Sequence, residues 1–143
     1  MRKRVTAKLI IAPNPILTTV CEPVEDGENV SGIIRDMMYI LTNSKTGVGL
    51  AAPQAGYSKQ IILVSANGFP ITMINPVIIS WKNDQATREE GCLSYPGVYK
   101  EIPRFTEIVV HDTIRVPQTF YGFEARIIQH EIDHLDGMCK VGE

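Results

Sequence analysis

The sequence predicts an α+β fold in a single domain over residues 1–143. Apolar residues recur at helical spacing near the start and again at the end, and β-branched runs of strand length lie between them. Strands and helices do not alternate regularly, which argues against a doubly wound parallel sheet. The chain shows no repeat and no linker, and its 143 residues are enough to bury one core.

The first predicted helix lies within NVSGIIRDMMYILTNSKTG, residues 29–47. Its apolar residues recur at three- and four-residue spacing: Val30, Ile33, Ile34, Met37, Met38 and Leu41. Gly47 suits the end of this helix. The next segment, GVGLAAPQAGYS at 47–58, is predicted to be a loop because glycine and proline interrupt it.

Strands are predicted at QIILVS (60–65), ITMINPVIIS (71–80) and TEIVVHD (106–112), each rich in β-branched residues. The stretch DQATREEGCLSYPGVYKEIPRF, at 84–105, is polar and is predicted to be irregular and rich in turns. The last segment, GFEARIIQHEIDHLDG at 122–137, has helical periodicity and closes at its final glycine.

Charge and composition exclude several classes of partner. The net charge is only −2, so no surface typical of binding to nucleic acid or anionic membranes is indicated. Pro13 and Pro15 interrupt the short apolar run after the basic start, which fits neither a signal peptide nor a spanning helix. We therefore expect a cytoplasmic protein without nucleic-acid or membrane partners. Three widely spaced cysteines, an odd number, argue against a disulfide framework.

The motif HEIDH lies on the predicted final helix. Residues four apart share one helix face, so His130 and His134 can bind the same metal ion. Glu131 sits one residue further round, where a general base for metal-assisted hydrolysis is needed. The alternative is an amphipathic helix with two surface histidines. His111, in a strand-like run, is interpreted as an ordinary histidine.

A catalytic metal site normally has three protein ligands and one open position, so a third ligand is needed. The metzincin pattern would place it at Lys140, which has no lone pair when protonated. A downstream glutamate could only be the terminal Glu143, a poor anchor. Cys139 follows the predicted helix end, where burial explains it equally well. Cys92, in the polar EEGCLS stretch, is the stronger candidate, although spacing alone cannot choose between it and Cys21.

The stretch GVGLAA formally matches the dinucleotide fingerprint GxGxxA. That fingerprint must come after a strand and open a helix, whereas here a predicted helix precedes it and Pro53 and Gly56 interrupt the residues after it. We interpret the stretch as backbone that passes close to another group. Gln54 is then either an amide that donates to an oxygen gaining charge or a solvated surface residue, and the sequence leaves both open.

Three segments together resemble the motifs of the peptide deformylase family. GVGLAAPQ (47–54), EGCLS (90–94) and QHEIDHLDG (129–137) match, in order, GxGxAAxQ, EGCLS and QHExDHLxG. The resemblance extends to PNPIL, CEPV and GFEAR, so it covers nearly the whole chain. It implies antiparallel or mixed β-sheets packed around a central C-terminal helix that carries HExxH, plus an N-terminal helix.

The resemblance implies a hydrolase that removes the formyl group from the N-terminal formylmethionine of nascent polypeptides and releases formate. It implies one divalent metal ion, with Fe²⁺ as the native ion and Zn²⁺, Ni²⁺ or Co²⁺ also accepted. The implied metal ligands are Cys92, His130 and His134. The implied catalytic groups are the general acid/base Glu131 and two donors to the carbonyl oxygen, the Gln54 amide and the Leu93 N–H. The implied substrate-binding residues are Val48, Gly49, Gly91, Phe123 and Ile127.

We expect a monomer that acts on N-formylmethionyl peptides, and two other functions stay open. A zinc peptidase of the HExxH type would need a downstream ligand, and a non-catalytic metal-binding module would need a fourth protein ligand.

The chain departs from the family pattern at several positions. Tyr95 and Tyr99 stand where an aliphatic residue and an arginine are common, and Arg88 and Arg126 replace apolar neighbours of the side-chain pocket. These departures concern the substrate preference and not the reaction. The sequence ends six residues after Gly137, where bacterial members usually continue into a strand and a helix. A short form lacking that C-terminal extension is therefore expected, and contact with the ribosome is not implied.

Overall fold

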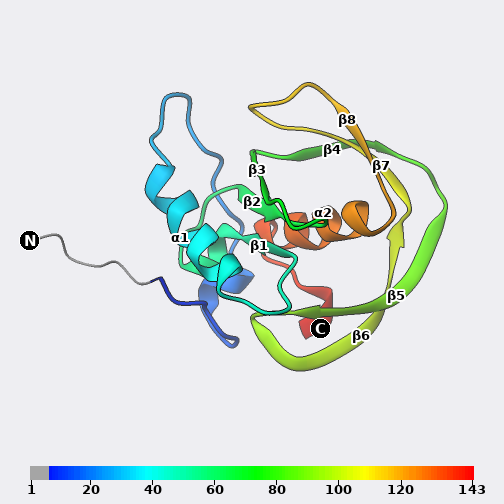
Figure 1. The fold of residues 1–143 in the computed structure, drawn as a ribbon, viewed down its shortest axis with the longest axis horizontal. Coiled ribbons are helices and arrows are strands. Elements are labelled where there is room, and N and C mark those ends of the chain that lie inside the picture. Colours follow the sequence, from blue (N-terminus) through cyan, green and yellow to red (C-terminus); the bar gives the residue numbers. More distant parts are fainter. Residues whose placement is uncertain (1–6) are drawn as a thin grey trace, which may run out of the picture.

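The structure is a computed structural model that describes residues 7–143, and it confirms the predicted α+β fold (Figure 1). Within that range the strands form three antiparallel sheets. They surround helix α2 (Gly122–Leu135), which carries the HEIDH motif, while helix α1 (Ser31–Thr42) packs outside the first sheet. The central helix is therefore the one that carries the two candidate histidine ligands.

The first sheet has the order β1–β2–β3, with strands β1 (Gly49–Ala51), β2 (Ile61–Val64) and β3 (Ile71–Ile74). The second has the order β4–β7–β8, with strands β4 (Val77–Trp81), β7 (Glu107–His111) and β8 (Gln118–Tyr121). The third is a hairpin of β5 (Gln85–Cys92) and β6 (Tyr95–Phe105). Three short 3-10 helices within the described residues are η1 (Pro15–Thr18), η2 (Ala52–Ala55) and η3 (Lys140–Gly142).

The apolar run of β2 explains how α2 is held in place. Successive strand side chains point to opposite faces, and all four residues of β2 are buried. Ile62 and Val64 pack in one cluster with Ile128 of α2, whereas Ile61 and Leu63 pack in another with the apolar face of α1. Each fully buried aliphatic side chain contributes about 1.5–3 kcal/mol relative to exposure. The first sheet is thus covered on both faces, and α2 is anchored along its length.

The prediction of an irregular segment at 84–105 is wrong. The segment forms β5 and β6, which pair in register from Gln85 opposite Phe105 to Gly91 opposite Tyr99. Most of its side chains are exposed, so the hairpin lacks the apolar alternation by which a half-buried strand is recognised. The hairpin is stabilised by hydrogen-bonded pairing between its two strands, and hydrophobic periodicity does not predict such pairing.

The predicted strand at 71–80 is two strands in different sheets. The chain turns between them at Asn75, which has a φ of +53°, and Pro76 comes next. The Asn75 side chain accepts a hydrogen bond from the Val24 N–H at 2.8 Å and donates one to the Val24 carbonyl at 3.0 Å. This two-sided contact with a distant segment stabilises the turn.

Two further predictions near the first motif are corrected. The predicted loop at 47–58 contains β1 and η2. Helix α1 ends at Thr42 rather than near Gly47, and the Asn43 side chain donates to the Tyr39 carbonyl at that end. Within residues 7–143, neither helix reaches the length and apolarity that a membrane span requires.

Candidate metal centre and cavity

Helix α2 places its two motif histidines on one buried face. Their ring centroids are 5.1 Å apart, and His134 is fully buried while His130 is 8% exposed. The alternative of two surface histidines is therefore wrong. His111 lies on β7, away from the group of metal donors around these two histidines.

Cys92 reaches these histidines from the end of β5, where the pairing register shifts after Gly91. Its Sγ lies 3.3 Å from the His134 Nε2. Donor atoms of four residues lie within 4.8 Å of one another, and these residues are Cys92, His130, His134 and Cys139. A tetrahedral ion with bonds of about 2.0–2.3 Å has ligand–ligand edges of about 3.3–3.8 Å. The donors therefore fit a divalent ion bound by nitrogen and sulfur.

The three cysteines have different surroundings. Cys21 packs in the core, and its N–H donates to the Leu135 carbonyl at 2.9 Å, so it lies outside the donor group. Cys139 is 7% exposed and also belongs to the donor group, so it is both buried and close to the site. The interaction between the two thiols raises the pKa of Cys92 and lowers that of Cys139. One of the two thiols therefore ionises readily beside the histidines.

Glu131 is a buried carboxylate without a full set of partners. It is 4% exposed, and its Oε1 has no hydrogen-bond partner among the described residues. Burial raises the pKa of Glu131 above its ordinary value, and the nearby His130 and His134 only partly oppose this. A Cβ at position 49 would lie 2.7 Å from the Glu131 Oε2, so the close approach of β1 requires Gly49.

Glu90 is a buried carboxylate that contacts both a candidate metal ligand and two arginines. Its carboxylate accepts from the Arg104 Nε and Nη2 at 2.9 Å each, from the Arg126 Nη1, and contacts the His130 Nδ1 at 3.1 Å. The contact with Nδ1 leaves the other ring nitrogen of His130 to face a metal. Burial opposes ionisation, but the hydrogen bonds from His130 and Arg104 outweigh it and lower the pKa of Glu90 to about 2. Arg104 also pairs with Asp133 at 2.7 Å.

We expect Glu90→Gln to lose stability in a pH-dependent way. The pKa of Glu90 is about 2 in the folded protein and ordinarily 4.5, so the unfolded chain binds the proton first as the pH falls. The stability advantage of the unsubstituted protein over Glu90→Gln is therefore full above pH 4.5 and shrinks as the pH falls toward 2. Urea unfolding of the metal-free proteins across this range measures it. Glu89→Gln, at the exposed neighbouring position, is the control, and an advantage independent of pH would contradict the expectation.

Gln54 is held rigidly and is only 1% exposed, so the alternative of a solvated glutamine is wrong. Its Oε1 accepts from the Ala51 N–H at 2.9 Å. Its Nε2 donates to the Ser94 Oγ at 3.1 Å and contacts the Cys92 Sγ at 3.6 Å. The Ser94 hydroxyl in turn donates to the Ile10 carbonyl at 2.7 Å. The amide nitrogen is thereby directed toward the metal donors.

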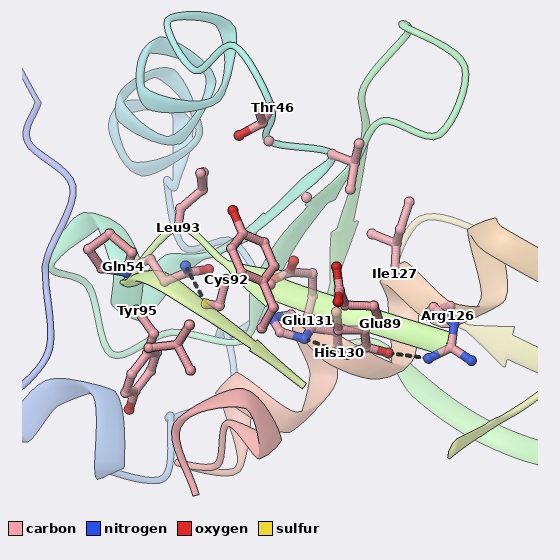
Figure 2. Close-up of a pocket in the computed structure, with 18 of the residues that line it drawn as sticks. Thr46, Gln54, Glu89, Cys92, Leu93, Tyr95, Arg126, Ile127, His130 and Glu131 are labelled. Carbon is pink, nitrogen blue, oxygen red and sulfur yellow. Dashed lines mark hydrogen bonds and ion pairs between the residues drawn. The ribbon is translucent and has the colours of Figure 1, made fainter. Parts of the chain in front are cut away.

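A cavity of about 370 Å³ opens onto this group (Figure 2). Its lining includes Gln54, Cys92, Leu93, His130 and Glu131, which come from all three motifs. The five residues implied to bind substrate also line it, namely Val48, Gly49, Gly91, Phe123 and Ile127. The structure therefore brings the motif residues into one cavity, with the exception of His134, which lies behind the lining.

The departures from the family pattern fall at different distances from the cavity. Tyr95, Tyr99 and Arg126 line it, whereas Arg88 is exposed and borders a separate hollow. The Arg126 guanidinium donates to Glu90 and to the carbonyls of Ile102 and Ala86, at 2.8 and 2.6 Å. The positive charge of Arg126 is thus paired with the Glu90 carboxylate at one side of the cavity.

Sequence reasoning missed three residues of this site and left a fourth, Cys139, equally well explained by burial. Glu90, Ser94 and Arg104 are buried polar residues on or beside the β5–β6 hairpin, and Cys139 completes the donor group. A charged side chain in a strand carries no periodic signal, so only the EEG run before Cys92 hinted at a buried carboxylate.

Comparison with known proteins places this geometry in a family. Residues 6–142 match the model of the polypeptide deformylase family. A peptide deformylase of Desulforudis audaxviator is 48% identical, covering 92% of this chain and 88% of that protein. One of Orientia tsutsugamushi (strain Ikeda) is 38% identical, covering 93% of this chain and 83% of that protein. The Met-Ala-Ser-bound crystal structure of the class I type b peptide deformylase from Acinetobacter baumannii aligns with a TM-score of 0.88 and 30% identity, covering 98% of this chain and all of that one.

The match is not confined to the motifs. It includes both helices and all three sheets, and the hairpin that sequence periodicity missed lies inside the matched residues. Since the family match spans residues 6–142 and these two relatives align over more than four-fifths of their length, this chain belongs to the peptide deformylase family.

Proposed function

We propose that this chain is a metal-dependent hydrolase that removes the formyl group from the N-terminal formylmethionine of nascent polypeptides. The observation that carries the proposal is the meeting of Cys92, His130 and His134 next to a cavity lined by Glu131, a buried carboxylate whose Oε1 has no hydrogen-bond partner among the described residues. We propose residues 1–143 as a single catalytic domain that acts as a monomer in the cytoplasm, where nascent chains are made.

Cys92, His130 and His134 are the proposed ligands of one divalent ion. We propose Fe²⁺ as the native ion, with Zn²⁺, Ni²⁺ or Co²⁺ also accepted by the mixed sulfur and nitrogen donors. When bound, such an ion acts as a Lewis acid and lowers the pKa of water in the site toward neutrality. The contact of His130 with Glu90 keeps that imidazole oriented for binding.

Glu131 is proposed to move the proton. Water attacks the formyl carbon, and Glu131 accepts the proton that the water loses. The carbon–nitrogen bond then breaks, and Glu131 returns the proton to the leaving amine, so the products are formate and a free amino terminus. The raised pKa of Glu131 suits both halves of this transfer, because it brings the carboxyl closer to the operating pH.

Gln54 and the Leu93 N–H are proposed to stabilise the negative charge that develops on the formyl oxygen. Gln54 is fixed by its bonds to Ala51 and Ser94, so its amide needs little reorganisation when the charge appears. Leu93 comes directly after Cys92 and lines the cavity, which supports this role for its backbone N–H.

We expect Gln54→Ala to lower kcat for formate release by about 10²–10³-fold, because one oxyanion donor is removed. The metal content should not change, since Gln54 is not a ligand. Steady-state kinetics with metal analysis check this result. Gln60→Ala is the control, because the Gln60 amide donates to the Cys21 carbonyl outside the cavity. A rise in KM with kcat unchanged would instead assign Gln54 to ground-state binding.

The substrate backbone is proposed to lie along the cavity as an added strand. Within the described residues, β1 pairs only with β2, so its other edge at Gly49 is free to pair with an extended peptide. Gly91 lies across the cavity on β5. The methionine side chain would then rest on Ile127, which is 4% exposed, with Val48 and Phe123 toward the solvent. Binding of Met-Ala-Ser to the Acinetobacter baumannii relative supports this class of ligand.

The two other functions are less well supported. The donor group within residues 7–143 contains no carboxylate, so the ligand that a thermolysin-like peptidase requires is not found there. Cys139 does supply the fourth donor that a structural zinc module would need. A closed structural zinc site does not require a cavity lined by a buried carboxylate and an oriented amide. The presence of Glu131 and Gln54 in the cavity therefore favours a catalytic role.

Formate release from formyl-Met-Ala-Ser tests the proposal. Protein prepared without oxygen and loaded in turn with Fe²⁺, Zn²⁺, Ni²⁺ or Co²⁺ is expected to release formate with at least one of these ions, and metal-free protein is not. Mass spectrometry of the products separates loss of the formyl group from cleavage of an internal peptide bond. Internal cleavage would support the peptidase, and no reaction with any of the four ions would defeat the proposed function.

A further inference from the structure

We propose that Cys139 is an additional ligand of the metal centre, so that this chain holds its ion with two thiolates and two imidazoles. The inference rests on the proposed function for the other three ligands. It concerns a residue outside the three motifs, one that sequence reasoning placed no nearer to the metal than to the core.

The distances between donor atoms carry the proposal. The Cys139 Sγ lies within 4.8 Å of the donor atoms of Cys92, His130 and His134, while tetrahedral edges measure about 3.3–3.8 Å. A displacement of about 1 Å or less therefore brings the sulfur to a bonding position. A cysteine that served only as core filling would not need to face three other metal-binding side chains.

The fold directs Cys139 to this position through a tight turn after α2. Gly137 adopts a φ of +73°, and a Cβ there would lie 2.8 Å from the Thr18 carbonyl oxygen. The Met138 N–H then donates to the Asp133 carbonyl at 2.9 Å, which turns the chain back toward the helix. The apolar cluster of Cys139, Val141 and Ile102 holds η3 against β6 (Figure 1). The position of the Cys139 thiol is therefore set by the turn that precedes it and by the packing of η3 that follows it.

Cys139 approaches the donors from the side away from the cavity. Cys92, His130 and Glu131 line the cavity, whereas Cys139 and His134 do not. A sulfur bound from that side would leave the cavity side open for substrate, so a fourth protein ligand at Cys139 would be compatible with catalysis. Two thiolates also balance the charge of a divalent ion, and they favour retention of soft or borderline metals.

X-ray absorption of the zinc-loaded full-length protein, kept reduced, counts the ligands directly. We expect two sulfurs at about 2.3 Å and two nitrogens at about 2.0–2.1 Å. Cys139→Val should show one sulfur and release zinc to a chelator at least about tenfold more readily. Cys21→Val is the matched control, because Cys21 is also buried but lies outside the donor group, and this variant should keep both sulfurs.

The spectrum of the unsubstituted protein can overturn the proposal even if Cys139→Val does not fold. One sulfur in its spectrum would overturn the inference, and zinc binding that still depends on Cys92 would leave the proposed function standing. A protein that binds no zinc at all would defeat both. If Cys139→Val folds, retains both sulfurs and holds zinc unchanged, the second sulfur does not come from Cys139 and the inference fails.

Discussion

Replacing Glu131 by glutamine is expected to lower formate release by about 10²–10⁴-fold, because the amide can neither accept nor return the proton. The metal content should stay unchanged, since Glu131 does not belong to the donor group. Folding stability should not fall, because Glu131→Gln removes a buried charge whose Oε1 has no partner among the described residues. Kinetics, metal analysis and thermal unfolding on one preparation measure all three quantities.

The pH dependence of the reaction gives a second readout. Glu131 must be ionised to accept a proton, and burial raises its pKa above the ordinary value of 4.5. Activity should therefore decline on the acid side at a pH above 4.5, and this limb should be missing from the residual activity of Glu131→Gln. Glu124→Gln, in the first turn of the same helix, is the control and should keep both rate and limb. An equal loss of formate release in Glu131→Gln and Glu124→Gln would contradict the proposed role of Glu131 in proton transfer.

Replacing Cys92 by serine is expected to weaken metal binding strongly and to abolish formate release, because the proposed thiolate ligand at the end of β5 is lost. Loss of a partner that only orients a ligand costs about 10–100-fold in metal affinity, and loss of a ligand itself should cost more. Chelator competition and formate release measure the two effects. Cys21→Ser is the control, because its sulfur lies outside the donor group. Unchanged formate release in Cys92→Ser would contradict the assignment of Cys92 as a ligand, whereas internal peptide cleavage that persists in this variant would favour a peptidase that does not use this cysteine.

The second thiol makes this experiment more specific. If Cys139 also binds the ion, Cys92→Ser should retain weak zinc binding that disappears when Cys139 is replaced as well. If Cys139 is only a core residue, the double substitution should bind no less zinc than Cys92→Ser. Retention of tight zinc binding in the double variant would contradict the whole assignment of ligands.

Elements that depend on neighbours along the chain are predicted correctly from the residues alone. The four-residue spacing of His130 and His134 reflects the period of a helix, and the apolar run of β2 predicted a strand. The three motifs, read as contiguous strings, identified the family and with it the expected ligands. These features involve residues close together in the sequence, so they can be recognised without a structure.

Contacts between residues far apart in the sequence become known only from the folded chain. Cys92 and His134 are 42 positions apart and Gln54 and Cys92 are 38, and long-range packing sets their contacts. No hydrophobic periodicity in the sequence indicated the β5–β6 hairpin, the ion pairs of Glu90 or the position of Cys139. Exposed strands and buried charges are stabilised by partners far away in sequence. A side chain's type limits the chemistry it can perform, and its burial and partners, which are properties of the folded chain, select the role it takes.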